Sequence, residues 1–307
     1  MFNELERAGI TVFERGWLSS NNVLLRGGDG DAAVIVDTGY SSHSEQTVAL
    51  LRQALRGAPL ARIVNTHLHS DHCGGNAAIQ AGFGCAIDVP AGEAETVDRW
   101  DESKLTFRAT GQHCPRFQRT GSIVAPNAIQ AGQWTWQVIA SPGHAPMSFA
   151  LYQPELELLI SADALWENGF GVVFPELEGE AAFGDVGATL DRFAQLRVRW
   201  VIPGHGKPFS DMTSAIERAR RRLDGFIADP RKHALHAAKV LIKFRLLEIQ
   251  ATSWTELDAW LRGTPYFSAV VDAHFPGVDP LQWSHALVDT MCRSGALRAD
   301  TQQIFNA

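Results

Sequence analysis

Residues 61–76 read Ala-Arg-Ile-Val-Asn-Thr-His-Leu-His-Ser-Asp-His-Cys-Gly-Gly-Asn, and this stretch decides the fold. Its first five residues form a short apolar run, which predicts a buried strand. Four donors follow directly: His67, His69, Asp71 and His72. In an extended chain the first three of them share one side, and a turn at the fourth adds its ring. Neutral imidazole nitrogens and carboxylate oxygens are usual ligands of Zn²⁺, so the stretch predicts a divalent metal site at a strand end.

Three further donors stand at comparable positions later in the chain. His144 follows the expected strand 136–139 in a Pro-Gly turn, Asp163 follows the run 156–161, and His205 follows the strand 200–202. Each donor therefore lies at the junction of a strand and a loop, where a stiff scaffold can hold a site. The alternative interpretation, polar turns that satisfy only local hydrogen bonds, is disfavoured because a buried group of such donors without a cation would be left under-satisfied.

Composition narrows the class of protein. The chain has 307 residues, of which 45% are hydrophobic, enough for a large sandwich and an appendage. Its 27 Lys and Arg against 34 Asp and Glu give a net charge of −7, which does not favour a polyanionic partner. A run of about 18 apolar residues is absent, as is a secretory leader, so we expect no membrane association. The four cysteines have no framework spacing, which predicts free thiols and a cytoplasmic location.

A similar order of strands and a helix occurs in each half of the first 210 residues, which predicts two sheets. The first half contains strands at 17–25, 32–36 and 61–65 and a helix at 44–56; the second contains strands at 148–152, 156–161 and 200–202 and a helix at 187–196. Such halves favour two sheets packed face to face with helices outside. Between them, a helix is expected at 92–105, and the segment 82–130 is a candidate substrate-facing loop. After residue 210 helices are expected at 212–228, 234–248, 253–261 and 281–294.

The motif THxHxDHxGG, present at residues 66–75, resembles the signature of the metallo-β-lactamase superfamily, and is most similar to its glyoxalase II-like dinuclear branch. The resemblance covers about residues 15–210. It implies an α/β (α+β) fold, a four-layer αββα sandwich. The helical tail resembles a small winged-helix-like domain, so we expect a catalytic domain at 1–228 and a C-terminal domain at 229–307.

The resemblance also implies a ligand set. His67, His69 and His144 would hold a first metal, Asp71, His72 and His205 a second, and Asp163 would bridge both. Two cations ~3.5–4 Å apart repel, so a shared carboxylate and a shared hydroxide are expected between them. Asp71 would in addition orient the nucleophile as a catalytic residue. The expected cofactors are two divalent ions, zinc first, with iron or manganese as alternatives.

Two functions remain open at the sequence level. The first is hydrolysis of a thioester or ester, a small-molecule acyl substrate whose anionic leaving group the basic strip from Arg218 to Arg245 would meet. The second is a metal-dependent ribonuclease or phosphodiesterase with the tail binding nucleic acid, which the charge disfavours. Trp166 stands where lactonases of the superfamily often carry Tyr, which weakens lactone opening. Substrate-binding residues are unknown, and the oligomeric state is open, a dimer included.

The sequence also predicts roles for several residues outside the ligand set. Cys73 is expected to pack away from the metals, and Asn65 and Thr66 to hydrogen-bond the ligand rings. Lys207 is either an exposed loop lysine or a contact for an anionic substrate group. The adjacent pair His113 and Cys114 is expected to be a plain loop.

Overall fold

The first sheet contains the strand that leads into the motif. A computed structural model describes residues 2–28 and 32–307, so part of the turn expected at 26–31 lies outside the described residues. This sheet has the strand order β1-β2-β3-β4-β5-β6. Its strands are β1 (Ile10–Phe13), β2 (Asn22–Leu25), β3 (Ala33–Val36), β4 (Leu60–Val64), β5 (Ala86–Pro90) and β6 (Gly121–Ile123). From β3 to β6 the strands pair in parallel, so their carboxyl ends meet at one edge.

The second sheet has the order β11-β10-β9-β8-β7. Its strands are β7 (Asn127–Ala131), β8 (Trp134–Ala140), β9 (Phe149–Gln153), β10 (Leu158–Ala162) and β11 (Trp200–Pro203). Only β10 and β11 pair in parallel, with Ile160 opposite Ile202. This register brings the ends of these two strands side by side, where Asp163 and His205 follow.

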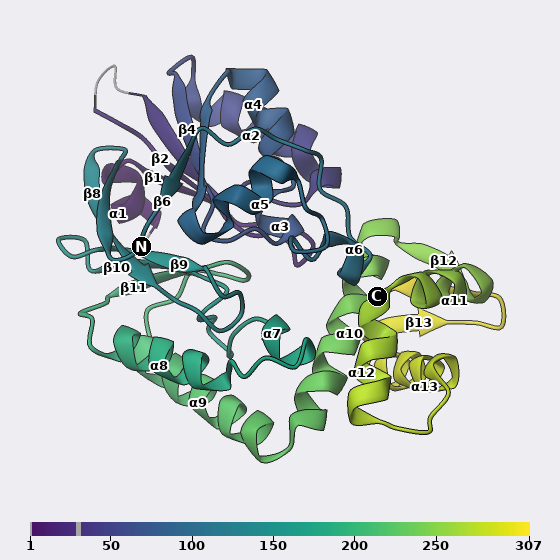
Figure 1. The fold of residues 1–307 in the computed structure, drawn as a ribbon. Coiled ribbons are helices and arrows are strands. Elements are labelled where there is room, and N and C mark those ends of the chain that lie inside the picture. The colour runs from purple at the N-terminus through teal and green to yellow at the C-terminus, as the bar shows by residue number, and fades with distance from the viewer. Residues whose placement is uncertain (1, 29–31) are drawn as a thin grey trace.

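Helices cover the outer face of each sheet (Figure 1). On the first sheet lie α2 (Ser44–Leu55), α4 (Asn76–Phe83) and α5 (Ala94–Arg99), which bury Leu51, Ile79 and Val97 against it. On the second lie α8 (Phe183–Ala194) and α9 (Met212–Ala228). Between the sheets a separate core contains Trp136 and Phe149, both fully buried. The predicted αββα sandwich is confirmed.

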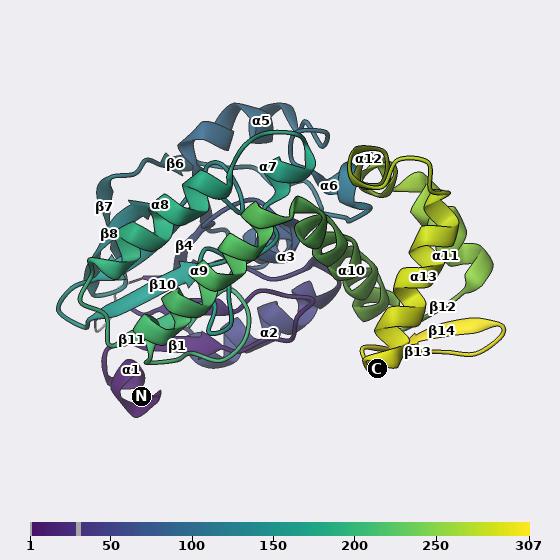
Figure 2. The same ribbon diagram turned by 90° about the horizontal axis from the view of Figure 1, so that it is seen from below.

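The C-terminal part is helical with a small antiparallel sheet (Figure 2). It contains α10 (Pro230–Ile249), β12 (Ala251–Ser253), α11 (Trp254–Gly263), α12 (Pro265–His274), α13 (Pro280–Arg293), β13 (Leu297–Ala299) and β14 (Gln303–Asn306). The long helix α10 lies between the sandwich and the rest of this part. Tyr40 Oη donates to Glu248 Oε1 over 3.0 Å, and the rings of Phe174 and Tyr266 lie 5.8 Å apart, so the two parts are packed together.

Several element boundaries differ from the expectations. The strand expected at 17–25 begins only at Asn22, and the helix expected at 92–105 is confined to α5. Strand β5, helix α4 and helix α12 were not expected.

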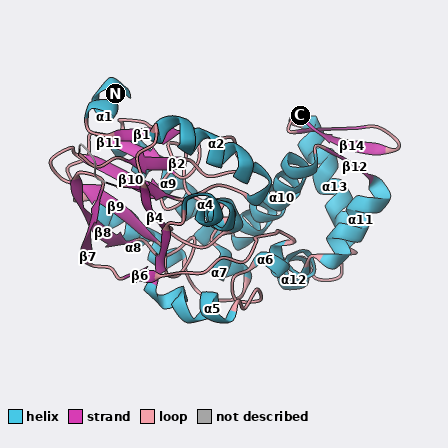
Figure 3. Cartoon of the chain, turned by 90° about the horizontal axis from the view of Figure 1, so that it is seen from above, coloured by secondary structure: helices cyan, strands magenta, loops and turns pink. Residues whose placement is uncertain are grey.

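The remaining short elements are α1 (Phe2–Arg7), η1 (Ser41–His43), α3 (Ser70–Cys73), η2 (Ala91–Glu93), α6 (Phe107–Thr110) and α7 (Phe174–Leu177). Figure 3 shows the strands of the sandwich on one side and the mainly helical C-terminal part on the other. Within residues 2–28 and 32–307, every helix is too short or too polar to span a lipid bilayer.

Candidate metal centre

The seven predicted donors converge at one edge of the sandwich, beyond the ends of β4, β8, β10 and β11. Their ligand atoms fall into two groups, each with all atoms within 4.8 Å of one another. The groups are His67, His69 and His144, and Asp71, His72, Asp163 and His205. Five of the seven are buried, and His69 and Asp71 are slightly more exposed.

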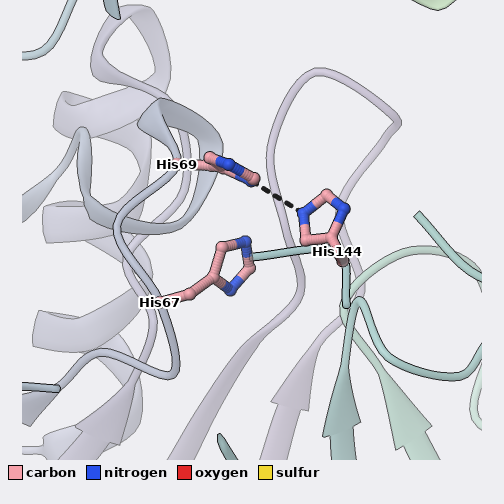
Figure 4. Close-up of side chains that lie close together, drawn as sticks. All are labelled: His67, His69 and His144. Atoms are coloured by element: carbon pink, nitrogen blue, oxygen red, sulfur yellow. Dashed lines mark hydrogen bonds between the residues drawn. The ribbon is translucent and has the colours of Figure 1, made fainter. Parts of the chain in front are cut away.

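The first group is made of three rings that face a common point (Figure 4). His69 Nδ1 lies 2.7 Å from His144 Nε2. The His67 ring centroid lies 4.7 Å from that of His69 and 5.0 Å from that of His144, nearly perpendicular to each. Nδ1 of His144 is held by the carbonyl oxygen of Val172 at 2.5 Å, which leaves Nε2 directed at the group.

The second group contains two carboxylates and two rings. His205 Nε2 lies 2.9 Å from Asp71 Oδ2, and His72 Nε2 lies 3.9 Å from the same oxygen. Asp163 joins the groups: its Oδ1 is 3.4 Å from His72 Nε2, while its Oδ2 is 3.4 Å from His144 Nε2 and 3.8 Å from His205 Nε2. Asp163 therefore lies between a ring of the first group and the rings of the second.

The local backbone differs from the alternation expected for the motif. His69 is extended (φ −68°, ψ 150°) and is the N-cap of the helical turn α3, whose Cys73 N–H donates to the His69 carbonyl over 3.1 Å. Extended alternation thus holds only as far as His69, and the helical turn carries Asp71 and His72 to the second group. Gly74 and Gly75, which follow this turn, pack closely against the backbones of Ser41 and Thr38, where a Cβ would lie 2.5 Å from backbone atoms.

Glycines also make room beside the donors. A Cβ on Gly204 would lie 2.0 Å from Asp163 Oδ1, and one on Gly171 would lie 2.4 Å from His144 Nδ1. Real Cβ atoms do not approach other atoms so closely, because such distances lie well inside the sum of the van der Waals radii. The backbone at these two glycines therefore forms part of the wall of the centre.

Asp37 is the functional residue that sequence reasoning missed. Its Oδ2 lies 2.7 Å from His72 Nδ1, its Oδ1 accepts from the Thr66 N–H at 2.9 Å, and its Oδ2 accepts from Thr66 Oγ1 at 2.8 Å. Thr66 Oγ1 in turn lies 3.1 Å from His67 Nδ1, as expected for Thr66, whereas Asn65 Nδ2 donates to the His72 carbonyl and not to a ring. A signal existed: Asp37 directly follows β3, the parallel neighbour of the motif strand.

These contacts leave ligand atoms without partners. Within the described residues, the buried Nε2 atoms of His67 and His72 have no hydrogen-bond partner, although the Nδ1 atoms of both rings are held. A buried polar atom without a partner is costly, and a divalent cation would relieve that cost. The donor set of imidazole and carboxylate suits such a cation.

The surroundings lower the pKa of His67 and His69 but raise the pKa of His72. Burial, together with the neighbouring His72, His69 and His144, lowers the pKa of His67 well below its usual range, and burial lowers the pKa of His69 to about 3. Neutral rings are the form that binds a metal. Burial also disfavours the protonated form of His72. The carboxylates of Asp163, Asp37 and Asp71 favour that form and raise the pKa of the ring well above its usual value.

A cavity that spans about 610 Å³, part of it open to solvent, borders both groups. Its walls come from the loop before β2, the segment around α6, the loops after β10 and the helix α10. The non-donor lining includes Trp17, Thr106, Thr110, Gln112, Trp166, Val172, Phe174, His236, Val240, Leu241 and Phe244. Thr106, Thr110 and Gln112 belong to segment 82–130, the expected substrate-facing loop, so part of that segment borders the cavity.

The basic residues proposed as substrate contacts lie elsewhere. Among the residues that the structure describes, this cavity has no lining Lys or Arg. Arg218 Nε donates to the Glu167 carbonyl over 2.7 Å, Arg220 pairs with Asp191, and Arg245 pairs with Glu248. Lys207 is exposed. Cys73 is fully buried, with its Sγ 3.7 Å from Cys114 Sγ.

Known proteins resemble the chain in sequence and in fold. A hydroxyacylglutathione hydrolase of Rhodospirillum rubrum is 29% identical over 199 residues, which cover 64% of this chain and 60% of that protein. A beta-lactamase-like protein 2 homolog of Caenorhabditis elegans is 28% identical over 229 residues, covering 72% of this chain and 65% of that protein. The chain thus spans about 60% of the length of the first of these relatives.

The solved structure of a metallo-beta-lactamase family protein from Thermus thermophilus matches with a TM-score of 0.58 at 21% identity, covering 97% of this chain and 99% of that one. This likeness concerns the fold, and it extends through the C-terminal part. The family model described as Metallo-beta-lactamase superfamily matches residues 15–205, more than half of the chain. The chain belongs to the metallo-beta-lactamase superfamily.

Proposed function

We propose that this protein is a metal-dependent hydrolase with a dinuclear centre. The observation that carries the proposal is the arrangement of the donors in two groups with Asp163 between them. A carboxylate in that position offers one oxygen to each group, which is what a pair of mutually repelling cations requires.

In this proposal, His67, His69 and His144 would hold one cation, and Asp71, His72 and His205 would hold the other. Asp163 would serve both. The pair would supply a water of lowered pKa and a Lewis acid for the scissile carbonyl. Zinc is the proposed occupant on the basis of the nitrogen and oxygen donors, and iron or manganese would accept the same set.

The side chains around the donors fix their directions. Asp37 holds the His72 ring by Nδ1, and Val172 holds His144 by Nδ1, so the opposite nitrogens face the centre. The Trp166 indole N–H donates to Asp163 Oδ1 over 3.2 Å, which keeps that carboxylate from rotating. Asp71, between the second group and the cavity, is the proposed catalytic residue that orients the attacking water.

A thioester or ester is the proposed substrate. The relatives named hydroxyacylglutathione hydrolase support a thioester, and the cavity beside the donors accommodates a small-molecule acyl group. Cleavage of nucleic acid, the second candidate, gains no support from the arginines of α9 and α10, because Arg218, Arg220 and Arg245 are engaged within the chain.

The experiment is a comparison of substrates on the metal-loaded protein. Acetyl, butyryl and lactoyl thioesters are expected to be hydrolysed, with activity removed by a chelator and restored by Zn²⁺, Fe²⁺ or Mn²⁺. Single-stranded RNA is expected to remain uncut. Cleavage of RNA with a steep dependence on salt, and no thioester hydrolysis, would contradict the proposal.

We further propose that the domain boundary lies at Asp229, and that the chain works in the cytoplasm. Helix α9 ends at Ala228, and Asp229 caps α10 by accepting from the Arg231 N–H. Leu246, Phe267 and Val288 of the C-terminal part beyond it belong to a third core, which Val172 and Leu177 of the sandwich join.

A further inference from the structure

A second cavity continues the first along α10. It spans about 870 Å³, much of it open to solvent, and shares Trp17, His236, Val240 and Phe244 with the cavity at the donors. Beyond these shared residues its lining comes from the far half of α10 and the end of α13: Lys239, Lys243, Leu247, Met291, Ser294 and Ala296. The two cavities therefore adjoin along α10, and together we call them the path from the candidate metal centre to the surface near the end of α13.

One face of α10 forms the floor of this path. His236, Val240, Phe244 and Leu247 recur at helical spacing, so they lie in a row on the same side. With a rise of about 1.5 Å per residue, the row from His236 to Leu247 is roughly 16 Å long. A long substrate can thus extend along the helix while its reactive group remains at the donors.

The four residues of this row are uncharged, and two lysines of α10, Lys239 and Lys243, border it. Burial and the nearby Arg222 lower the pKa of His236 to about 3, so its ring is neutral. The ammonium of Lys243 is engaged at the C-terminal end, within 2.8 Å of the Ala296 carbonyl oxygen and 2.6 Å of Asn306 Oδ1. Lys243 therefore lines the path with its aliphatic stem, and long basic side chains commonly pack in this way. Trp17, 56% exposed and stacked on His205, forms the opposite side.

Another part of the lining of the first cavity, around α6, is polar and uncharged. Thr106, Thr110 and Gln112 line it, and Gln112 Oε1 accepts from Ser70, which leaves the Gln112 amide N–H groups for other acceptors. Two arms of a substrate that diverge from a carbonyl at the donors would therefore meet an apolar wall on one side and a polar, uncharged wall on the other.

We propose that the path along α10 binds the acyl chain of a long-chain acyl thioester or ester, with the polar leaving group against Thr106, Thr110 and Gln112. The proposal rests on the hydrolase function proposed above and narrows its substrate class. A polyanionic leaving group finds no cation in the first cavity, whereas a hydrocarbon chain finds apolar contacts over the full row.

The first test is a series of thioesters of N-acetylcysteamine, a neutral thiol, from acetyl through butyryl and octanoyl to lauroyl. Each added methylene that leaves water is expected to raise kcat/KM roughly two- to fourfold until the path is filled. A matched series keeps the acetyl group and lengthens the alkyl thiol. Independence of kcat/KM from acyl length, or a rise confined to the thiol series, would overturn the proposal.

The second test narrows the far cavity. Ser294→Trp places an indole in its lining, and the ratio of lauroyl to acetyl kcat/KM is expected to fall by roughly tenfold or more as chain contacts are lost. Arg293→Trp is the matched control, since Arg293 is exposed on the same helix and lines neither cavity, and its ratio is expected to equal that of the wild type. Equal ratios in both variants would contradict the chain's placement.

Binding of laurate to the metal-free protein separates the two proposals. Calorimetric titration is expected to show laurate binding that Ser294→Trp weakens and Arg293→Trp does not. If laurate binds in this way but every thioester is inert, the hydrolase function is wrong and the chain-binding path stands. If short thioesters are hydrolysed but laurate does not bind, the path assignment alone is wrong.

Discussion

Oδ2 of Asp37 lies 2.7 Å from Nδ1 of His72, and both side chains are fully or almost fully buried. The contact joins the end of β3 to the motif after β4, its parallel neighbour in the sheet. Asp37 has φ 55°, a left-handed conformation that a non-glycine residue adopts at a cost. The backbone turns there so that one carboxylate reaches both His72 and Thr66, which in turn contacts His67.

Loss of this carboxylate should weaken the second cation. Asp37→Asn retains the shape but removes the charge that holds the His72 ring, so affinity for the second equivalent of metal is expected to fall about 10- to 100-fold. Competition with a chromophoric chelator measures the two affinities. Asp88→Asn, which removes a carboxylate paired with Arg62 on the same sheet, is the control. Equal metal affinities in both variants would argue against a role for Asp37.

Substitution of Gly204 should disturb Asp163 without removing a donor. A Cβ there would lie 2.0 Å from Asp163 Oδ1, so Gly204→Ala must displace the carboxylate or the backbone by about an ångström or more. A displacement of that order is expected to lower turnover of a short thioester about 100-fold. Gly184→Ala in α8 is the control, since its Cβ would have nothing within 4 Å, and it should retain full turnover. Full turnover in Gly204→Ala would show that the wall at this glycine is compliant.

Stability should depend on pH through Glu93. Burial raises the pKa of Glu93 from 4.5 to about 7, and within the described residues its Oε2 has no hydrogen-bond partner. From about pH 4.5 to 7 the unfolded chain loses this proton while the folded chain retains it, so the free energy of unfolding falls as pH rises.

Glu93→Gln is therefore expected to stabilise the protein near pH 8 by up to roughly 3 kcal/mol, and to have little effect near pH 4. Denaturant unfolding at the two pH values measures the difference. The control is Glu95→Gln, which removes the same charge at an exposed position paired with Arg99 and should shift stability by no more than about 0.5 kcal/mol at either pH. A stabilisation that does not depend on pH would contradict the burial of an ionised carboxylate.

The seven donors were predictable because each follows an apolar run, and such runs predict strands whose ends can meet. His144, Asp163 and His205 are separated by many residues, yet each occupies the same kind of junction. The family predicted from the motif is confirmed by the match over residues 15–205. Hydrolysis, the identity of the metals and the ligand roles stay predictions that the experiments above test.

The parts that sequence reasoning missed depend on tertiary contacts. Asp37 follows an apolar strand, as the donors do, but its contact with His72 depends on the parallel pairing of β3 with β4. The extended alternation expected for the motif ends at the helical turn α3, in which the Cys73 N–H donates to the His69 carbonyl oxygen. Strand β5, Ala86–Pro90, contains an aspartate and a terminal proline, which weaken its apolar pattern. The cavity along α10 exists only because Trp17 and α13 lie opposite that helix.

The most direct test of the dinuclear centre is the metal content of the purified protein, measured by mass spectrometry with the protein concentration from amino-acid analysis. The wild type is expected to contain about two divalent ions per chain, and Asp163→Ala about one or fewer, with loss of most thioester turnover. A wild type that holds a single ion under gentle purification and after reloading, or an Asp163→Ala variant that retains two, would contradict the account.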